Sequence, residues 1–489
     1  ATLNRRIGGL FPTDFDPARW GVPASMLDSI DPIAVWNLVS AVDAFVSAGF
    51  SPAELLRFIH PADLACTQGT GFGGMRSMHK LFVDRFLGEE YPQDILQETL
   101  PNVVAAHTMQ SYIGGYGSMI NPVGACATAA VSIEEGVDKI AAHKTDFVVA
   151  GAIDDIQVES IVGFGSMNAT ANSQELLDRG ISPRFVSRAN DRRRGGFVEA
   201  QGGGTVLLTR ASVAVEMGLP VLAVVAHAQT FADGAHTSIP APGLGALAVA
   251  RGGASSPLAR SLAALGVGVD DVAFVSKHDT STNANDPNES DLHTRVGRAL
   301  GRSAGNPLLV VSQKTLTGHA KGGACVFQVG GIIDAFRSGV IPANIALDCV
   351  DDKMEQYSPL VWLRSPLDLS ARGPVRAAFA TSLGFGHVSG FLALVHPGAF
   401  EAVVEREAGS EALARWRSAS DARLRAGSRH FEMGMLGHAP LFEPVDARRL
   451  PDDPALGAAG DPHEVEAQML LDPRARLGAD GYYHLPDQQ

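Results

Sequence analysis

The feature that most limits the possible folds of this chain is a series of short apolar runs that are continuous and not alternating. A continuous run is typical of a strand with both faces covered, whereas alternation is typical of a strand with one face in water. The runs predicted as buried strands are 146–152, 204–209, 220–226, 271–276, 307–312, 375–381 and 390–395. Amphipathic segments such as 129–143 separate them and predict helices. The pattern therefore predicts an α/β protein in which sheets and helices are stacked in layers.

Beyond about residue 400 the composition of the chain changes. The stretch EREAGSEALARWRSASDARLRAG predicts a charged, solvated helix, and the sequence from Leu436 onward is rich in Pro, Asp and Gly. We interpret this last part as an extended packing arm or linker with little chemistry of its own. The 489 residues have room for two or three ordinary domains or for one large duplicated domain.

Charge and apolar content exclude several classes of function. The net charge of -14 disfavours a nucleic-acid partner, which is held through phosphate contacts, and gives no attraction to anionic lipid. No apolar run reaches the roughly 20 residues that cross a bilayer, and the apolar stretch near the start is too short for a signal peptide. The four cysteines form no CxxC or zinc-type pattern, which indicates reduced thiols in a cytoplasm.

Cys126 lies in the stretch NPVGACATAA, where small residues precede a helix-forming run. A Cys on the first turn of a helix is acidified by the helix dipole, which predicts a pKa of about 3.5–7.5. Small neighbours also leave room for a substrate and for backbone N–H groups that face an oxyanion. On its own, however, the stretch favours a buried Cys packed among alanines over a nucleophile.

Two histidines favour the catalytic interpretation. His278 lies in SKHDTSTNANDPNE and His319 in SQKTLTGHAKGG, and each stretch follows a predicted strand. Polar loops that follow strands of an α/β sheet meet at the edge where such sheets bind ligands. A Cys with two neutral imidazoles suits thioester chemistry, because the thiolate accepts an acyl group and two N–H donors stabilise an enolate.

The stretch GTGFGG satisfies the dinucleotide-binding pattern G-x-G-x-x-G at Gly69, Gly71 and Gly74, and a helix is predicted from Met75. The preceding PADLACTQ is a poor buried strand, however, and no strand follows to carry the acidic residue that binds a ribose. We interpret these glycines as a tight turn that permits close packing. A nicotinamide-dependent oxidoreductase remains a distant alternative.

These motifs together resemble the β-ketoacyl synthases, the condensing enzymes of the thiolase fold, and in particular the ketosynthase part of bacterial and fungal type I fatty acid synthases. The opening segment FPTDFDPARWGVP also resembles that group, and the resemblance covers residues 11–397. The motifs that follow in the family's order are GTGFGG, SMINPVGACATAA, NDRRRGGFVEAQGGG, KHDTSTNANDPNE, KTLTGHAKGG and TSLGFGHVSG.

The resemblance implies a thiolase-like, layered α/β/α/β/α fold built from two similar halves. We expect a lead-in segment over 1–20, an N-terminal half with the nucleophile over 21–210 and a C-terminal half with both histidines over 211–397. A C-terminal helix and extended tail over 398–489 complete the chain.

The resemblance also assigns the residues of the active site. Cys126 matches the acylated nucleophile, and His278 and His319 match the pair that assists decarboxylation of the malonyl thioester and stabilises the enolate. Lys314 matches the lysine that orients these groups, with Glu289 as its expected ion partner.

Three further positions match residues around the substrate. Thr280 and Thr282 match the threonines that bind the phosphopantetheine arm, and Phe385 matches the gating phenylalanine. The backbone N–H groups of Cys126 and Phe385 would form the oxyanion hole.

The chain departs from the family pattern at several positions. Asp279 and Ser281 replace the glycines of HGTGT, Gln201 stands where a Glu is common, and His387 replaces the last glycine of GFGG. These changes leave the matched catalytic positions intact but obscure the selectivity for acyl chains.

We predict structural roles for the other charged and thiol side chains of note. Arg194 matches the DxxRxG pattern and is expected to form an ion pair with Asp191. Cys66 and Cys325 are expected in the core, and Cys349 in a connection.

The implied activity is that of a 3-oxoacyl-[acyl-carrier-protein] synthase, an acyltransferase that needs no metal or redox cofactor. Acyl and malonyl thioesters arrive on acyl carrier protein, and the chain is expected to form a homodimer within a larger fatty acid synthase, with residues 102–115 as the contact. Two alternatives stay open. One is a condensing enzyme that acts on a polyketide carrier or on coenzyme A thioesters, and the other is a scaffold or decarboxylase-only relative, against which the Cys at 126 argues.

Overall fold

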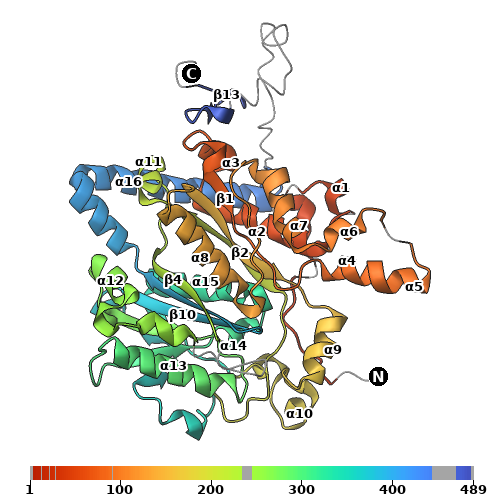
Figure 1. Ribbon diagram of the computed structural model, residues 1–489, viewed down its shortest axis with the longest axis vertical. Coiled ribbons are helices and arrows are strands. Elements are labelled where there is room, and N and C mark those ends of the chain that lie inside the picture. Colours follow the sequence, from red (N-terminus) through yellow and green to blue (C-terminus); the bar gives the residue numbers. More distant parts are fainter. Residues whose placement is uncertain are drawn as a thin grey trace.

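The computed structural model describes residues 4–12, 14–20, 22–27, 29–90, 92–233, 245–442 and 470–485. Two sheets form the centre of the molecule, one of three strands and one of six (Figure 1). The first has the order β1–β2–β3, with Leu64–Cys66, Phe147–Asp154 and Gly202–Thr209. The second has the order β4–β11–β10–β5–β6–β8, with Val224–Ala232, Val388–Val395, Ala377–Gly384, Val272–Ser276, Leu308–Val311 and Leu360–Trp362.

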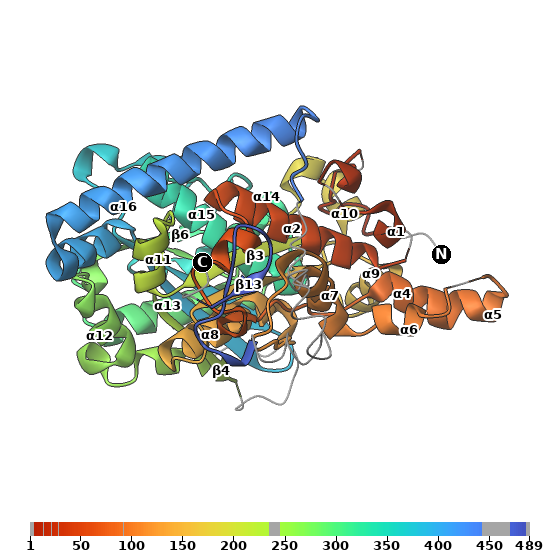
Figure 2. The same ribbon diagram turned by 90° about the horizontal axis from the view of Figure 1, so that it is seen from above.

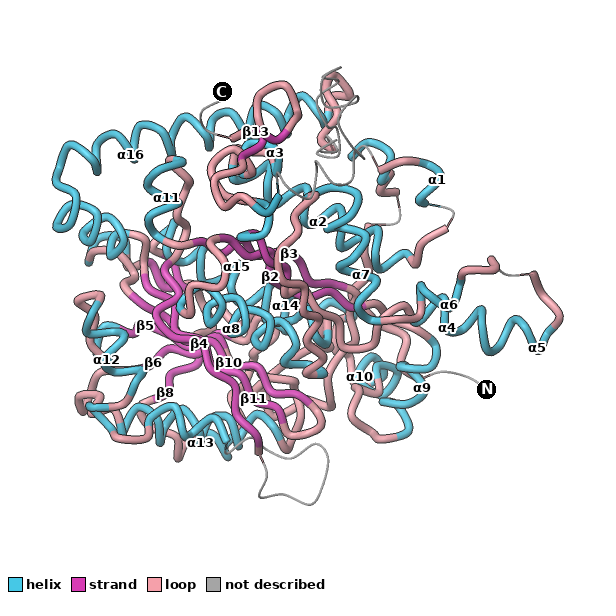
Figure 3. The backbone as a smooth tube through the Cα atoms, turned by 45° about the horizontal axis from the view of Figure 1, so that its top comes forward, coloured by secondary structure: helices cyan, strands magenta, loops and turns pink. Residues whose placement is uncertain are grey.

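Two central helices separate the sheets (Figures 1 and 3). Helix α8 (Thr128–Ala141) packs against β2 and β4, and helix α15 (Ala324–Ser338) packs against β3 and β10. Side chains of both helices and of the facing strands share one hydrophobic cluster, to which Ile133 and Ile332 contribute. The middle of the molecule is therefore a dry layer of helix between two layers of sheet.

Further helices cover the outer faces of the two sheets. Helices α2 (Pro32–Ala48) and α7 (Pro101–Thr108) pack over the three-stranded sheet, and α12 (Pro257–Ala264) and α13 (Asn285–Ala299) pack over the six-stranded one. The layers follow the order α/β/α/β/α, so the predicted fold class is confirmed. No helix of the described ranges is both long enough and apolar enough to cross a bilayer.

The two halves repeat one arrangement around the central helices. Helix α8 leads to β2, which pairs antiparallel with β3, and α15 is likewise followed by the antiparallel pair β10 and β11. A 3-10 turn precedes each helix, and its first residue has a positive φ, 47° at Ala125 and 47° at Lys321. The two turns contact one another. The repeat thus brings the start of α8 and the start of α15 to one place.

The predicted strands are present with shifted bounds, and two predictions about them were wrong. The run 220–226 was predicted as a buried strand, but the strand is Val224–Ala232, which is half-buried along its length because it is the edge of its sheet. Leu64–Cys66, which we judged a poor strand, is β1, and every one of its residues is buried. A strand of three residues is too short to be detected as an apolar run.

Helix α16 (Gly398–Met435) crosses the outside of the molecule over α2 (Figure 2), with a break at Gly409. Some of its apolar side chains, among them Phe400 and Leu413, are buried, and Trp416 Nε1 donates to the carbonyl of Leu219 at 3.0 Å. The helix predicted as solvated is therefore solvated on one face only.

The end of the chain returns to the N-terminal half. Strands β12 (Arg476–Leu477) and β13 (Tyr483–His484) form a small hairpin, and the backbone N–H of Leu477 donates to the carbonyl of Leu56 at 3.0 Å. This part behaves as the expected packing arm, whereas 443–469 lie outside the described residues.

Candidate active site

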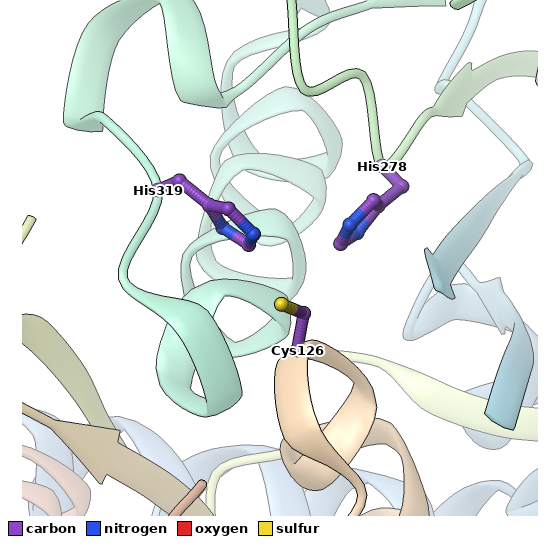
Figure 4. A group of neighbouring side chains, drawn as sticks. All are labelled: Cys126, His278 and His319. Atoms are coloured by element: carbon purple, nitrogen blue, oxygen red, sulfur yellow. The ribbon is translucent and has the colours of Figure 1, made fainter. Parts of the chain in front are cut away.

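Three side chains that are far apart in the sequence converge on one point (Figure 4). Cys126 lies in the 3-10 turn before α8, His278 follows the end of β5, and His319 lies just before the turn that opens α15. One sulfur and two ring nitrogens from these residues all lie within 4.8 Å of one another, and all three residues are buried. The ring centroids are 5.2 Å apart and the ring planes are nearly perpendicular, at 88°.

The turn that carries Cys126 is fixed by close packing. Ala125 has the positive φ that turns the chain, and the hydroxyl of Thr128 donates to its carbonyl at 2.7 Å while accepting from the N–H of Gly124 at 3.0 Å. Gly384 lies against this turn, since a Cβ at that position would be 2.4 Å from the Gly124 carbonyl oxygen. A small residue is therefore required where the end of β10 passes the nucleophile.

The thiol of Cys126 is not acidified. Burial raises its pKa to about 11, while the charge of Lys314 and a hydrogen bond from the Phe385 N–H act in the opposite direction with smaller effect. The predicted low pKa was wrong, because Cys126 precedes the regular turns of α8 and its surroundings exclude water. The two neighbouring imidazoles are neutral and do not replace the missing positive charge.

Alkylation of Cys126 by iodoacetamide is expected to accelerate about tenfold per pH unit between pH 7 and pH 10. The thiolate is the reactive form, and its fraction rises with pH as long as the pH lies below the thiol pKa. A thiol acidified to a pKa of about 7.5 or lower would give a rate that changes little above about pH 8. Peptide-resolved mass spectrometry measures this rate, with the partly exposed Cys349 in the same sample as the comparison.

His278 is held by Lys314 in one orientation and one protonation state. The Lys314 Nζ atom lies 3.1 Å from His278 Nδ1 and 2.5 Å from the His278 carbonyl oxygen. Burial and the nearby charge of Lys314 hold the pKa of His278 well below its usual value, so the ring is neutral. A protonated Lys314 that donates to Nδ1 leaves the ring proton on Nε2, where it is available to a substrate.

His319 is neutral for the same reasons but is not fixed in the same way. Burial, followed by the charges of Lys314 and Lys321, holds its pKa well below the usual value. Its ring lies edge-on to Phe197 with centroids 5.1 Å apart, and its Nδ1 has no hydrogen-bond partner among the described residues. Its tautomer is therefore free to change, and the ring can donate or accept a proton.

Glu289 binds backbone and not Lys314. Its carboxylate accepts from the N–H of His278 at 2.5 Å and of Asp279 at 2.9 Å, and it also accepts from the hydroxyl of Thr381. In the described part of the chain no direct Lys314–Glu289 contact forms, because Lys314 Nζ is turned to His278, and Glu289 acts on Lys314 only through its charge, which raises the pKa of the lysine against the larger effect of burial. The two residues hold the same loop from opposite ends, one at a backbone N–H and the other at a carbonyl.

The other predicted residues line the same cavity. Thr280 and Thr282 lie on its wall with their hydroxyl oxygens 3.0 Å apart, and Phe385 lies beside Cys126. Their roles toward a substrate remain predictions. The cavity is lined by Cys126, Ala169, Phe197, His278, Thr280, Thr282, Ala284, Asn285, His319, Leu383, Gly384 and Phe385.

Asp154 ties the glycine-rich turn to the active site and was missed from the sequence. Its buried carboxylate accepts from the N–H of Gly71 at 3.0 Å and of Gly322 at 2.7 Å, and from the Thr70 hydroxyl at 2.8 Å. The N–H of Gly71, which would face a pyrophosphate in a dinucleotide site, is thus occupied, and a Cβ at Gly74 would be 1.8 Å from a carbonyl oxygen. These contacts favour the packing interpretation. The sequence feature that could have indicated the role of Asp154 is its position as an acidic residue at the end of the apolar run 146–152.

The expected ion pair between Arg194 and Asp191 was also wrong. Arg194 donates to the backbone carbonyl of Asp191, and its charge pairs with Asp351 at 2.6 Å and with Asp286 at 3.6 Å. The carboxylate of Asp191 pairs with Arg188 at 3.2 Å. Cys66 and Cys325 are fully buried, as predicted.

The layered fold and the convergent Cys and His residues define the class of a thiolase-type condensing enzyme. Comparison with protein families shows which family of this class the chain matches. Residues 2–214 match the beta-ketoacyl synthase N-terminal domain, and residues 222–348 match the beta-ketoacyl synthase C-terminal domain. The chain belongs to the beta-ketoacyl synthase family, which confirms the predicted resemblance.

Individual relatives are larger than this chain. Fatty acid synthase 2 of Mycosarcoma maydis is 34% identical over 486 residues, which is 99% of this chain and 12% of that protein. Fatty acid synthase subunit alpha of Saccharomyces cerevisiae is 30% identical over 564 residues, covering 98% of this chain and 29% of that one. The noncanonical ketosynthase FabY from P. aeruginosa shares the fold, with a TM-score of 0.81 and 24% identity over 91% of this chain and 68% of that chain.

Proposed function

We propose that this chain is a 3-oxoacyl-[acyl-carrier-protein] synthase that lengthens an acyl chain by two carbons in fatty acid synthesis. The observation that carries the proposal is a single buried thiol within 4.8 Å of two imidazoles that are both held neutral. A decarboxylative Claisen condensation requires a nucleophile that holds the acyl group covalently, here the thiol, and two N–H donors beside it.

In the first half-reaction the acyl group moves to Cys126. The thiol proton passes to an imidazole nitrogen, and the thiolate attacks the carbonyl of the acyl thioester. The backbone N–H groups of Cys126 and Phe385 receive the developing oxyanion. The bond to the carrier sulfur then breaks, and the leaving carrier thiolate takes the proton from the imidazole.

In the second half-reaction malonyl thioester occupies the same pocket. The bond between its carboxylate and its α-carbon breaks, carbon dioxide leaves, and the electron pair remains as an enolate of the thioester. The Nε2–H of His278 and an N–H of His319 donate to the enolate oxygen. The enolate carbon attacks the acyl carbonyl, the bond to Cys126 sulfur breaks, and the thiolate takes up one proton from solvent, so that each cycle consumes one proton.

The proposed reaction implies its partners. Thr280 and Thr282, at the cavity wall, are placed to bind the phosphopantetheine arm of an acyl carrier protein. Two fungal fatty acid synthases support a larger assembly around this chain, because the chain spans only 12% of one and 29% of the other. The four unpaired cysteines support a cytoplasmic location.

The test is incubation with acyl and malonyl thioesters of acyl carrier protein. We expect carbon dioxide release and a carrier-bound product two carbons longer that carries a 3-oxo group, both detected by mass spectrometry. Parallel reactions with coenzyme A thioesters and with a polyketide carrier protein test the main alternative. Higher kcat/KM with either of those would contradict the proposed carrier, and no turnover with any would favour a scaffold.

The proposed enzyme is expected to be a two-fold dimer, and exposed apolar residues support a contact just beyond the stretch 102–115 that was predicted from the sequence. Most apolar side chains of that stretch are buried within the chain, whereas Met119, Ile120 and Val123 just beyond it are exposed. Met119 also bridges to Cys66 at the outer edge of the three-stranded sheet. An exposed apolar edge of this kind supports continuation of the sheet into a second copy.

Sedimentation at micromolar concentration is expected to give a dimer, and Met119→Glu with Val123→Glu is expected to give a monomer of reduced activity. A buried, unpaired carboxylate in the interface is the reason. The matched control is Val361→Glu, since Val361 is 41% exposed and lies in β8, the edge strand of the other sheet. A stable, fully active wild-type monomer would contradict the prediction.

A further inference from the structure

The turn after His278 has a backbone that favours glycine but contains none. Asp279 has a φ of 35° and Ser281 a φ of 61°. A positive φ is unfavourable for residues with a Cβ, although Asp tolerates it better than most. Something in the surroundings must hold Asp279 in this conformation.

Asp279 is held by buried contacts on several sides. One carboxylate oxygen lies 2.6 Å from Lys277 Nζ, and the other accepts from Asn190 Nδ2 at 2.7 Å and from the hydroxyl of Ser312. Lys277 and Asp279 are both fully buried. A carboxylate in such a place is stable only with its cation and its donors present.

Lys277 depends on Asp279 in turn. Its Nζ also donates to the Ser290 hydroxyl at 3.0 Å, to the Asp286 carbonyl at 3.2 Å and to the Asn190 side chain at 3.2 Å. These acceptors are neutral. Among the described residues, Asp279 is the only carboxylate within ion-pair distance of Lys277.

His278 lies between the two charged residues in the sequence. An ion pair between Lys277 and Asp279 therefore fixes the chain on both sides of the histidine at once. Lys314 and Glu289 hold the backbone of His278 itself, at its carbonyl and its N–H. The ion pair adds a constraint that neither of those contacts provides, namely the conformation of the following turn.

We propose that the buried Lys277–Asp279 pair is a positioning device that holds the left-handed turn after His278 and thereby presents this imidazole to the substrate above Cys126. The inference rests on the proposed function, in which His278 donates to the enolate of the malonyl thioester. Lys277 and Asp279 are positioning residues, because they act through His278 and line no part of the cavity.

The test compares Lys277→Met, Asp279→Gly and the double variant. Asp279→Gly relieves the positive φ but leaves Lys277 buried without its counter-ion, and Lys277→Met leaves the carboxylate without its cation. Each single variant is expected to lower malonyl decarboxylation by on the order of 10²-fold, the effect of a small misplacement of a reacting group. The double variant removes both charges and leaves a glycine in the turn, so it is expected to recover to within about tenfold of the wild type.

Rates are expressed per active site, counted by alkylation of Cys126, so that loss of folded protein does not register as loss of catalysis. Single variants that change only the melting temperature, or a double variant no faster than the slower single one, would overturn the inference. If Asp279→Gly does not fold, Asp279→Asn removes the same charge and enters the same comparison with Lys277→Met. A wild type that releases no carbon dioxide would overturn the proposed function and this inference with it, whereas an active wild type with additive variants overturns the inference alone.

Discussion

Replacement of Cys126 by serine is expected to abolish condensation, with a loss on the order of 10⁴–10⁶ in rate, as for removal of other catalytic nucleophiles. A hydroxyl is far less acidic than a thiol, and this site already raises the pKa of the thiol to about 11 by burial. Imidazoles whose pKa values are held well below the usual one are weak bases, so they activate a serine hydroxyl far less than they activate the thiol. The measurement is formation of the 3-oxo product from acyl and malonyl carrier-protein thioesters.

Acylation itself can be followed with a labelled acyl thioester and peptide mapping. The label is expected on Cys126 alone, because Cys66 and Cys325 are fully buried in the core and lie outside the cavity lining. Cys325→Ser is the matched control and should still accept the label. Label on Cys66, Cys325 or Cys349 in the wild type would contradict the assignment.

A second replacement separates the two half-reactions. Cys126→Gln removes the acyl acceptor but keeps His278 and His319, so we expect malonyl decarboxylation to persist without condensation. Loss of decarboxylation in this variant would mean that the sulfur itself takes part in carbon dioxide release.

The layered fold and the three central residues could be predicted from local sequence. Strands such as β2 and β5 are continuous apolar runs, and His278 follows its strand at once, so the position of this residue at a sheet edge is a local property. Cys126 and His319 lie before the two central helices, and each is followed by a run of small residues. These small residues are needed because the two turns pack closely against one another.

The features that could not be predicted depend on contacts between distant parts of the chain. The raised pKa of Cys126 arises from burial under segments such as 383–385, more than 250 residues away. Glu289 binds the backbone of His278 and Arg194 pairs with Asp351, and neither partner follows from the identity of the two residues. Side-chain type indicates that a charge needs a partner but not which of several it finds.

The correction to the thiol pKa changes what is expected of the two histidines. An acidified Cys126 would need neither ring for acylation, so both single replacements would spare that step. With a pKa of about 11 the thiol must instead lose its proton to a base during acylation. His278 is unsuited, because Lys314 occupies its Nδ1 and its Nε2 carries the proton, whereas the tautomer of His319 is free.

His278→Ala is therefore expected to lower malonyl decarboxylation by on the order of 10²–10³, the cost of one oxyanion donor, and to leave acylation of Cys126 largely intact. His319→Ala is expected to lower both half-reactions, since it removes a donor and the base. Lys314→Ala should also disturb both, because the lysine orders His278 and its charge favours the thiolate. Acyl transfer to Cys126 and carbon dioxide release are scored separately, and His278→Ala serves as the control for His319→Ala. Normal acylation in the His319→Ala protein would show that the thiol ionises without this ring. The role of both histidines would then be limited to stabilising the enolate.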